Sequence, residues 1–256
     1  NKMVFKCNIE QITDTELRIR LRATQRNASV FSPDSRYAVE HDTMDTTFRS
    51  MYLGLSAFLD ANTERRELLL GQRPPRFDSS FDEAIALTGD DFERVALKAE
   101  SARDYFLLVG PPGTGKTSRA LRRMVEHFYA ASSMQILLLA YTNRAVDEIC
   151  QSLSSITPCI DYIRVGSELS CDVRFRGHLL ENILAECNSR REVNIRMADC
   201  RVYVGTVASI AAKAELFKLK RFDVAIVDEA TQILEPQLLG ILCAKFADER
   251  NAVGKF

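Results

Sequence analysis

The feature that most constrains this chain is a glycine-rich segment, Gly110-Pro-Pro-Gly-Thr-Gly-Lys-Thr117. It fits the pattern G-x-x-x-x-G-K-[ST], follows the apolar run 105–109 and precedes a helix-like stretch at 118–131. Glycines let a backbone wrap so closely that successive N–H groups point at phosphate oxygens, and the new helix adds its positive N-terminal end. This order of strand, loop and helix predicts a phosphate-binding P-loop rather than a Gly/Pro-rich surface turn.

A P-loop predicts ATP and Mg²⁺ as ligands and gives its residues separate roles. We expect Lys116 to reach the β- and γ-phosphates and the Thr117 hydroxyl to bind Mg²⁺. The other loop residues are expected to surround the phosphates: Gly110, Pro112, Gly113, Thr114, Gly115 and Ser118.

An acidic pair follows a second apolar run. Val224-Ala-Ile-Val227 is typical of a buried parallel strand, and Asp228 and Glu229 come directly after it, where open α/β sheets bind ligands. Taken alone, such a pair would also suit the start of a helix. With a P-loop upstream, we expect Asp228 to hold Mg²⁺ through its water shell and Glu229 to orient and deprotonate the attacking water.

Composition indicates an ordinary globular protein. The 256 residues are 46% hydrophobic, which is enough for one large α/β domain and a smaller attachment. The formal net charge is −1, so any attraction to nucleic acid must be local. Seven cysteines without a C-x-x-C pair suit neither a zinc site nor a disulfide framework, which predicts reduced thiols. No apolar run approaches the roughly 18 residues of a membrane span, so we expect a cytoplasmic protein, or a nuclear one in a eukaryote, with no membrane partner.

The pattern of apolar residues divides the chain into two parts. Residues 1–41 alternate in short bursts that predict β-strands, and periodic apolar residues predict helices at 43–62 and 64–70. We place the boundary between residues 71 and 87, which gives a β-rich, barrel-like domain with a helical stalk at 1–75. Three arginines, Arg18, Arg20 and Arg22, share one strand face, which suits a solvated surface or, alternatively, a stripe that faces nucleic acid.

The second part, residues 76–256, alternates between strand and helix patterns. Such a rhythm predicts an α/β domain with a parallel sheet flanked by helices. The predicted strands are 105–109, 136–141, 162–165, 201–204 and 224–227, a helix is expected to open with Pro236, and a polar, mostly helical insertion is expected at 167–199.

Together, these motifs resemble those of superfamily 1 helicases of the B subgroup, which includes RNA helicases of nonsense-mediated decay and the helicase-nucleases of replication. Asp228-Glu-Ala-Thr-Gln232 is similar to their DEAxQ form of Walker B, Ala140-Tyr-Thr-Asn-Arg-Ala-Val-Asp147 to motif Ia, and Val204-Gly-Thr-Val-Ala-Ser209 to motif Ic. The resemblance is dense from about residue 87 to 244 and weaker over 1–75. It implies a RecA-like domain that couples ATP hydrolysis to 5′-to-3′ movement on single-stranded DNA or RNA.

The resemblance also implies roles for individual residues. Thr142, Asn143 and Thr206 correspond to groups that contact the nucleic-acid backbone, although from the residues alone they would be helix caps, and both roles can hold. Gln232 resembles the residue that couples the γ-phosphate or the attacking water to a second motor domain. It joins Lys116 and Glu229 as a predicted catalytic residue.

Two departures from the family pattern matter. The segment that reads adenine usually ends in Gln, and here Leu87-Thr-Gly-Asp-Asp91 puts Asp91 in that place. A carboxylate accepts from the adenine amino group but cannot donate to the ring nitrogen, which leaves the preference for ATP over GTP open. Motifs of a second RecA-like domain do not occur before Phe256. We therefore expect the N-terminal motor half of a longer helicase, which starts without an initiator Met and works with a second RecA-like domain of its parent chain.

Such a half is expected to hydrolyse ATP slowly, because the arginines that stabilise the transferring phosphoryl group come from the second domain. Arg119, Arg122 and Arg144 are not expected to replace them. Two alternatives stay open: another P-loop ATPase, such as an AAA-type machine or a nucleotide kinase, and a nucleotide-regulated binding module without turnover.

Overall fold

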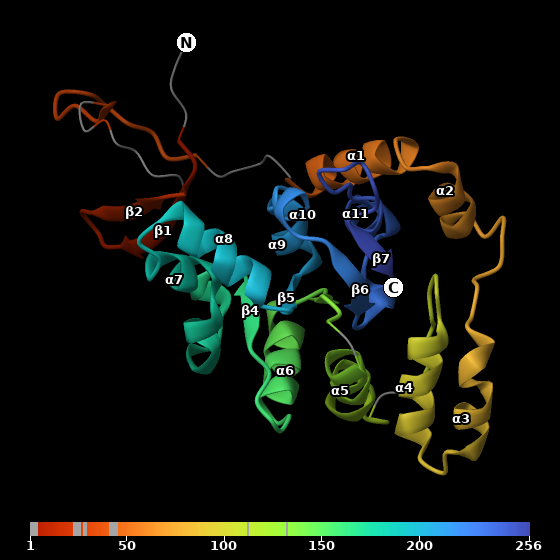
Figure 1. Cartoon of the computed structure of the whole chain (residues 1–256). Coiled ribbons are helices and arrows are strands. Elements are labelled where there is room, and N and C mark those ends of the chain that lie inside the picture. Colours follow the sequence, from red (N-terminus) through yellow and green to blue (C-terminus); the bar gives the residue numbers. More distant parts are fainter. Residues whose placement is uncertain (1–4, 23–26, 28–29, 41–45, 112, 132) are drawn as a thin grey trace. The chain divides into compact units, whose positions relative to one another are not determined.

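The computed structural model describes residues 5–22, 27, 30–40, 46–111, 113–131 and 133–256 (Figure 1). The chain forms two compact units, Asn1–Thr46 and Thr47–Phe256. This division comes earlier in the sequence than the expected boundary between residues 71 and 87, because the two helices of the expected stalk group with the larger unit. All seven cysteines are free thiols, as predicted. Within the described residues, no helix combines the length and apolar character that crossing a membrane requires.

The smaller unit contains an antiparallel hairpin of β1 (Cys7–Ile12) and β2 (Leu17–Leu21), which confirms short strands in this region. Two of its arginines have partners across the hairpin. Arg20 pairs with Glu10 at 2.6 Å, and Arg22 Nε donates to Asn8 Oδ1 at 2.9 Å. These cross-strand contacts favour the solvated surface over the stripe that faces nucleic acid.

The larger unit is built on a five-stranded parallel sheet with the order β4-β5-β3-β6-β7. Its central strand, Ile136-Leu-Leu-Leu-Ala140, is completely buried, as a parallel strand covered on both faces should be. Alternate residues of this strand belong to two separate hydrophobic clusters, one on each face of the sheet. The strands are β3 (Ile136–Ala140), β4 (Tyr162–Val165), β5 (Val202–Thr206), β6 (Phe222–Val227) and β7 (Val253–Lys255).

Helices cover both faces of this sheet, so the predicted RecA-like α/β fold is confirmed (Figure 1). One face is covered by α4 (Asp91–Ser101), α5 (Arg122–Ala131) and α6 (Asn143–Ser154). The other is covered by α7 (Leu180–Ala185), α8 (Arg190–Asp199), α9 (Val207–Ala212), α10 (Leu216–Leu219) and α11 (Glu235–Leu242). The expected insertion at 167–199 is mostly helical, since it contains two 3₁₀ helices (Glu168–Ser170 and Val173–His178) before α7 and α8.

Two helices that precede the sheet pack on α11. They are α1 (Thr46–Leu59) and α2 (Thr63–Leu69), which confirm the predicted helices except for residues 43–45, outside the described residues. Gly54 of α1 lies so close to α11 that an added Cβ would be 1.9 Å from the Pro236 carbonyl oxygen. A short 3₁₀ turn (Ser79–Phe81) and α3 (Asp82–Leu87) then lead into α4.

The strand predicted at 105–109 is wrong for this structure, because these residues have no regular secondary structure. One register position is paired as in a parallel sheet: Phe256 N–H donates to the Asp104 carbonyl, and Phe106 N–H donates to the Phe256 carbonyl, both at 3.0 Å. Beyond this pair the segment runs along the edge beside β7 without a ladder, and Leu107 and Val109 are 75% and 93% exposed. An apolar run forms a strand only where a neighbour supplies hydrogen bonds.

Candidate active site

The P-loop has a backbone that only glycine adopts easily. Gly113 and Gly115 have φ angles of 80° and 83°, in the left-handed region where side chains are strained. A Cβ on Gly110 would lie 3.1 Å from Thr114 Oγ1, which itself donates to the Pro111 carbonyl at 2.8 Å. Pro112, predicted to line the same loop, lies outside the described residues. The two left-handed glycines and the hydrogen bond from Thr114 to the Pro111 carbonyl account for the tight turn of the loop.

The helix after the loop begins with a wide turn. Residues Lys116–Leu121 form a π-helical turn before α5, and the Gly115 carbonyl accepts from both Arg119 N–H at 2.9 Å and Ala120 N–H at 3.0 Å. Single π turns inside α-helices are frequent at functional sites. Ser118 is exposed on this turn, at the N-terminal end where phosphate groups bind.

Lys116 turns back over the loop. Its Nζ donates to the Gly110 carbonyl at 2.6 Å and to the Pro111 carbonyl at 2.8 Å. An ammonium group carries three donors and no acceptor, so these carbonyls satisfy two of them. The cation thus lies against the loop that is shaped for phosphate.

A hydrogen bond joins the P-loop to the acidic motif. Thr117 Oγ1 donates to Asp228 Oδ2 at 2.6 Å, between residues 111 positions apart in the sequence. Asp228 is anchored to the central strand, since its N–H donates to the Leu139 carbonyl at 2.8 Å. A hydroxyl and a carboxylate are hard oxygen ligands of the kind that Mg²⁺ prefers, so this pair fits the predicted ion.

Glu229 follows in an unusual conformation. Its φ of 52° lies in the left-handed region, which is strained for a side chain and occurs most often at functional sites. The next residues form a 3₁₀ turn, Ala230–Gln232, that returns Gln232 to the carboxylate. Gln232 Nε2 donates to Glu229 Oε2 at 2.8 Å, and both side chains are exposed to solvent. The two predicted catalytic residues are therefore in direct contact.

The residues expected to contact nucleic acid begin two helices. Thr142 Oγ1 accepts from Ala145 N–H at 3.1 Å at the start of α6, and Thr206 Oγ1 accepts from Ser209 N–H at 3.0 Å at the start of α9. Asn143 is the first residue of α6. The capping interpretation is confirmed for the two threonines, of which Thr206 is buried and Thr142 exposed, but not for Asn143, which lies inside the helix. Ala140 and Thr206 are register partners, so both caps lie at the carboxyl edge of the sheet, where Asp228 also follows its strand.

Asp91 and the nearby arginines have other partners. Asp91 begins α4 with an 87% exposed side chain, and its carboxylate pairs with Arg94 at 2.7 Å. The Arg119 guanidinium lies 4.1 Å from the centre of the Phe92 ring, and Arg122 pairs with Glu126 at 2.9 Å. Both arginines on the helix after the P-loop therefore have side-chain partners of their own.

One supporting interaction was missed from the sequence. Arg164 is completely buried in β4 and pairs with Asp147 of α6, the last residue of the segment that resembles motif Ia. The signal was available, because an arginine inside the apolar strand Tyr162-Ile-Arg-Val165 needs a buried partner. This ion pair links α6 to strand β4 of the sheet.

Comparisons with known proteins agree with this geometry. A family model described as an AAA domain matches residues 93–252. The DNA replication ATP-dependent helicase/nuclease JHS1 of Arabidopsis thaliana is 30% identical over 217 residues, which cover 80% of this chain and 16% of that protein. The helicase/nuclease DNA2 of Homo sapiens is 26% identical over 236 residues (85% and 22%), and dna2 of Schizosaccharomyces pombe is 27% identical over 222 residues (82% and 15%). The chain thus spans about a fifth of the length of these relatives.

Proposed function

This chain belongs to the AAA domain family, and we propose that it works as the ATP-binding motor of a nucleic-acid helicase, moving 5′-to-3′ on single-stranded DNA or RNA. Its relatives are named ATP-dependent helicases, and its fold is that of a helicase-like motor domain. The observation that carries the proposal is the hydrogen bond between Thr117 and Asp228. It joins the P-loop to the acidic motif at the carboxyl edge of the sheet, as a Mg-ATP site would require.

In the proposed mechanism, the P-loop binds the phosphates of ATP. Successive backbone N–H groups of residues 113–118 donate to phosphate oxygens, and Lys116 Nζ exchanges loop carbonyls for the β- and γ-phosphates. Thr117 and Asp228 would hold Mg²⁺, which neutralises charge on the phosphates when bound. Asp91 is proposed to face the adenine, since its exposed carboxylate keeps acceptor capacity beside Arg94.

Glu229 is proposed as the general base for the attacking water. Its carboxylate accepts from Gln232, so one oxygen is oriented while the other can take a proton. Through the same contact, Gln232 would couple the attacking water or the γ-phosphate to a second RecA-like domain, which is the proposed partner.

We retain the division into an accessory part at 1–75 and a motor domain at 76–256. We propose a nuclear or cytoplasmic setting because the relatives are named for DNA replication.

Nucleic acid is proposed to lie across the starts of α6 and α9. Their N-terminal ends carry unpaired N–H groups and partial positive charge, which suit backbone phosphates. Thr142, Asn143 and Thr206 lie at these two ends. Binding there would need no net positive charge on the whole chain.

The proposal is tested by ATP hydrolysis of the longer protein with and without single-stranded nucleic acid. We expect Mg²⁺-dependent turnover that rises when poly(dT) or poly(U) is added, and duplex unwinding by the longer protein from a 5′ overhang. Turnover that no single strand changes would contradict the helicase assignment, and unwinding only from a 3′ overhang would contradict the direction.

A further inference from the structure

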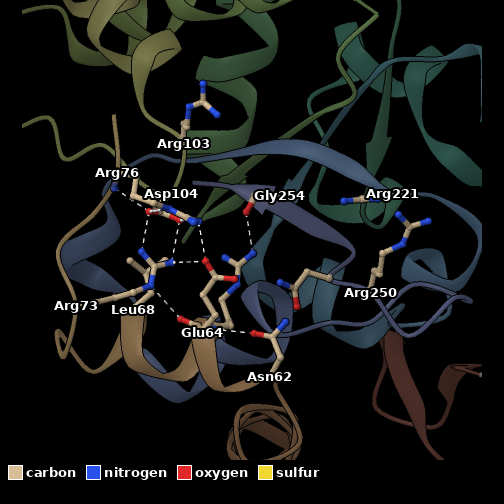
Figure 2. Close-up of a pocket in the computed structure, with 12 residues that line it drawn as sticks. Asn62, Glu64, Leu68, Arg73, Arg76, Arg103, Asp104, Arg221, Arg250 and Gly254 are labelled. Atoms are coloured by element: carbon tan, nitrogen blue, oxygen red, sulfur yellow. Dashed lines mark hydrogen bonds and ion pairs between the residues drawn. The ribbon is translucent and has the colours of Figure 1, made fainter. Parts of the chain in front are cut away.

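Several arginines of the larger unit are held by carboxylates of the chain. Arg73 Nη1 donates to Asp104 Oδ2 at 2.8 Å, and Arg76 Nη2 donates to Asp104 Oδ1 at 2.9 Å. Figure 2 shows both guanidinium groups against this carboxylate. On the helix after the P-loop, Arg122 pairs with Glu126 in the same way, at 2.9 Å. The charges of these arginines are balanced inside the protein, so they need no ligand.

Arg119, on the same turn as the end of the P-loop, differs from these arginines. It is exposed, and neither an ion pair nor a hydrogen bond joins its guanidinium to another residue that the structure describes. The carboxylate that responds to its charge is Asp90, the N-cap of α4. Backbone hydrogen bonds from Phe92, and then from Glu93, lower the pKa of Asp90, and Arg119 contributes a smaller part. The donors of Arg119 are therefore open to a ligand.

The side chain of Arg119 lies between the P-loop and α4. A Cβ added to Gly115 would be 3.2 Å from Arg119 Cδ, and the guanidinium carbon lies 4.1 Å from the centre of the Phe92 ring. One face of the guanidinium thus rests on Phe92, and the other is open because Arg119 is exposed. A planar guanidinium is a good stacking surface for a nucleobase. A base carried by phosphates on the P-loop is within reach of this surface.

Asp91 places a carboxylate beside this surface, directly before Phe92. Its side chain is exposed and is held by Arg94, whose Nη1 donates to Asp91 Oδ1 at 2.7 Å and whose Nη2 donates to the Thr88 carbonyl at 2.8 Å. An ionised carboxylate has about four acceptor positions and no donor, so the contact with Arg94 leaves most of its capacity unused. Only donors on a ligand can use the rest.

The edges of guanine and adenine differ in the donors that they offer. Guanine has two adjacent donors, N1–H and the N2 amino group, which match the two oxygens of a carboxylate. Adenine has one donor group, the N6 amino group, and the ring nitrogens on either side of it, N1 and N7, are acceptors. Their lone pairs repel a carboxylate oxygen. A carboxylate at this position therefore favours guanine over adenine.

We propose that Arg119 stacks on the base of the bound nucleotide, that Asp91 accepts hydrogen bonds from its edge, and that the site binds guanine nucleotides at least as tightly as adenine nucleotides. This inference rests on the proposed function, because it takes the phosphates of the nucleotide to lie on the P-loop. It extends the substrate class from ATP to GTP. Both nucleotides present the same γ-phosphate to the attacking water, so the proposed hydrolysis is the same for either base.

The test is calorimetric titration of the chain with the Mg²⁺ complexes of the β,γ-imido analogues of GTP and ATP. We expect the wild type to bind the GTP analogue at least as tightly as the ATP analogue. Asp91→Gln gives the side chain a donor beside its acceptor, which suits adenine, so the ratio of the two affinities should shift about tenfold toward ATP. Asp82→Gln is the matched control, because Asp82 is also an exposed first residue of a helix, α3.

Inorganic tripolyphosphate, which has no base, separates stacking from a contact with the phosphates. Arg119→Ala should weaken both nucleotide analogues about fivefold or more, the usual value of a stacked base, and should leave the affinity for tripolyphosphate unchanged. Arg190→Ala, at an exposed arginine of α8, is the control for this variant and should bind all three probes as the wild type does.

Tighter binding of the ATP analogue by the wild type would overturn the inference and leave the proposed function intact. The same holds if Asp91→Gln has the affinity ratio of Asp82→Gln, or if Arg119→Ala weakens tripolyphosphate as much as the nucleotides. Failure of the wild type to bind either nucleotide would overturn the proposed function together with this inference. Asp91 and Arg119 are both exposed, so their variants should fold.

Discussion

Asp228 and Glu229 are neighbours in the sequence but have different partners. Asp228 accepts from Thr117 of the P-loop, whereas Glu229 turns through a left-handed conformation and accepts from Gln232. This difference fits the separate roles proposed for them, a metal ligand and a base, although both are carboxylates after the same strand. Each should therefore respond differently to removal of its charge.

Replacing Glu229 with Gln should slow hydrolysis and leave ATP binding intact. The amide keeps the size of the side chain and one oxygen that can accept from Gln232, but it cannot take a proton, so we expect a loss of about 10²-fold or more in rate. Single-turnover hydrolysis and equilibrium ATP binding should be measured on the same protein. A variant that loses binding but keeps its rate when saturated would show that Glu229 is not the base.

Asp104 should contribute to the acid stability of the fold. Hydrogen bonds from Arg73, and then from Arg76, hold the pKa of this buried carboxyl below its usual range. A group with a lowered pKa in the folded state contributes stability that is present above about pH 4 and is lost as the pH falls. Asp104→Asn should therefore reduce the free energy of unfolding by about 3 kcal/mol at pH 7 and by less at pH 3.

Urea unfolding at both pH values checks this prediction. Asp60→Asn, at an exposed aspartate of the same unit, serves as the control and should change little at either pH. An equal loss for Asp104→Asn at pH 7 and pH 3 would show that the carboxylate charge is not what stabilises the cluster.

At the scale of elements, the N-terminus of α6 has an observed role in capping and a proposed role in nucleic-acid binding, and the two can be tested separately. Thr142→Asp should keep the cap of α6, because Asp is a good N-cap, so stability should change by less than about 0.5 kcal/mol. The new charge would repel a nucleic-acid phosphate, so binding of a single-stranded oligonucleotide should weaken. Ser189→Asp, at the N-cap of α8, is the matched control. If Thr142→Asp binds the oligonucleotide as this control does, the start of α6 does not contact nucleic acid.

Elements were predictable from the sequence where burial alone decides them. The strand at 224–227 reads as a continuous apolar run because helices cover both faces of the sheet. The run 105–109 has the same composition but lacks a partner along its length, and composition does not encode partners. For the same reason, the packing of α1 and α2 on α11 was not apparent.

The candidate site was predictable to the extent that it depends on motifs. The P-loop glycines and the Thr117 and Asp228 pair follow from motif order, and their geometry fits the assigned roles. The contact between Glu229 and Gln232 depends on the left-handed backbone conformation of Glu229, which no sequence pattern predicts. The hydrogen bond from Arg65 to the Gly254 carbonyl joins residues 189 positions apart, and no motif in the sequence indicates it.

At the scale of the whole molecule, the three arginines considered as substitutes for those of a second domain all have side-chain partners within the described residues. Arg119 stacks on Phe92, Arg122 pairs with Glu126, and Arg144 pairs with Glu148. The relatives extend well beyond the matched region. If the arginines for catalysis come from a second domain, this chain should bind ATP well and hydrolyse it slowly.

Equilibrium binding of Mg-ATP to the wild type and to Lys116→Ala tests the central claim most directly. The claim is that residues 110–117 bind the triphosphate, with Lys116 as the side-chain cation against the phosphates. Titration with a fluorescent, slowly hydrolysed ATP analogue should saturate the wild type and the control Lys218→Ala alike. Lys116→Ala should bind about 100-fold more weakly, since it removes the cation that is proposed to pair with the charged phosphates. Equal affinity of Lys116→Ala and the wild type would contradict the account.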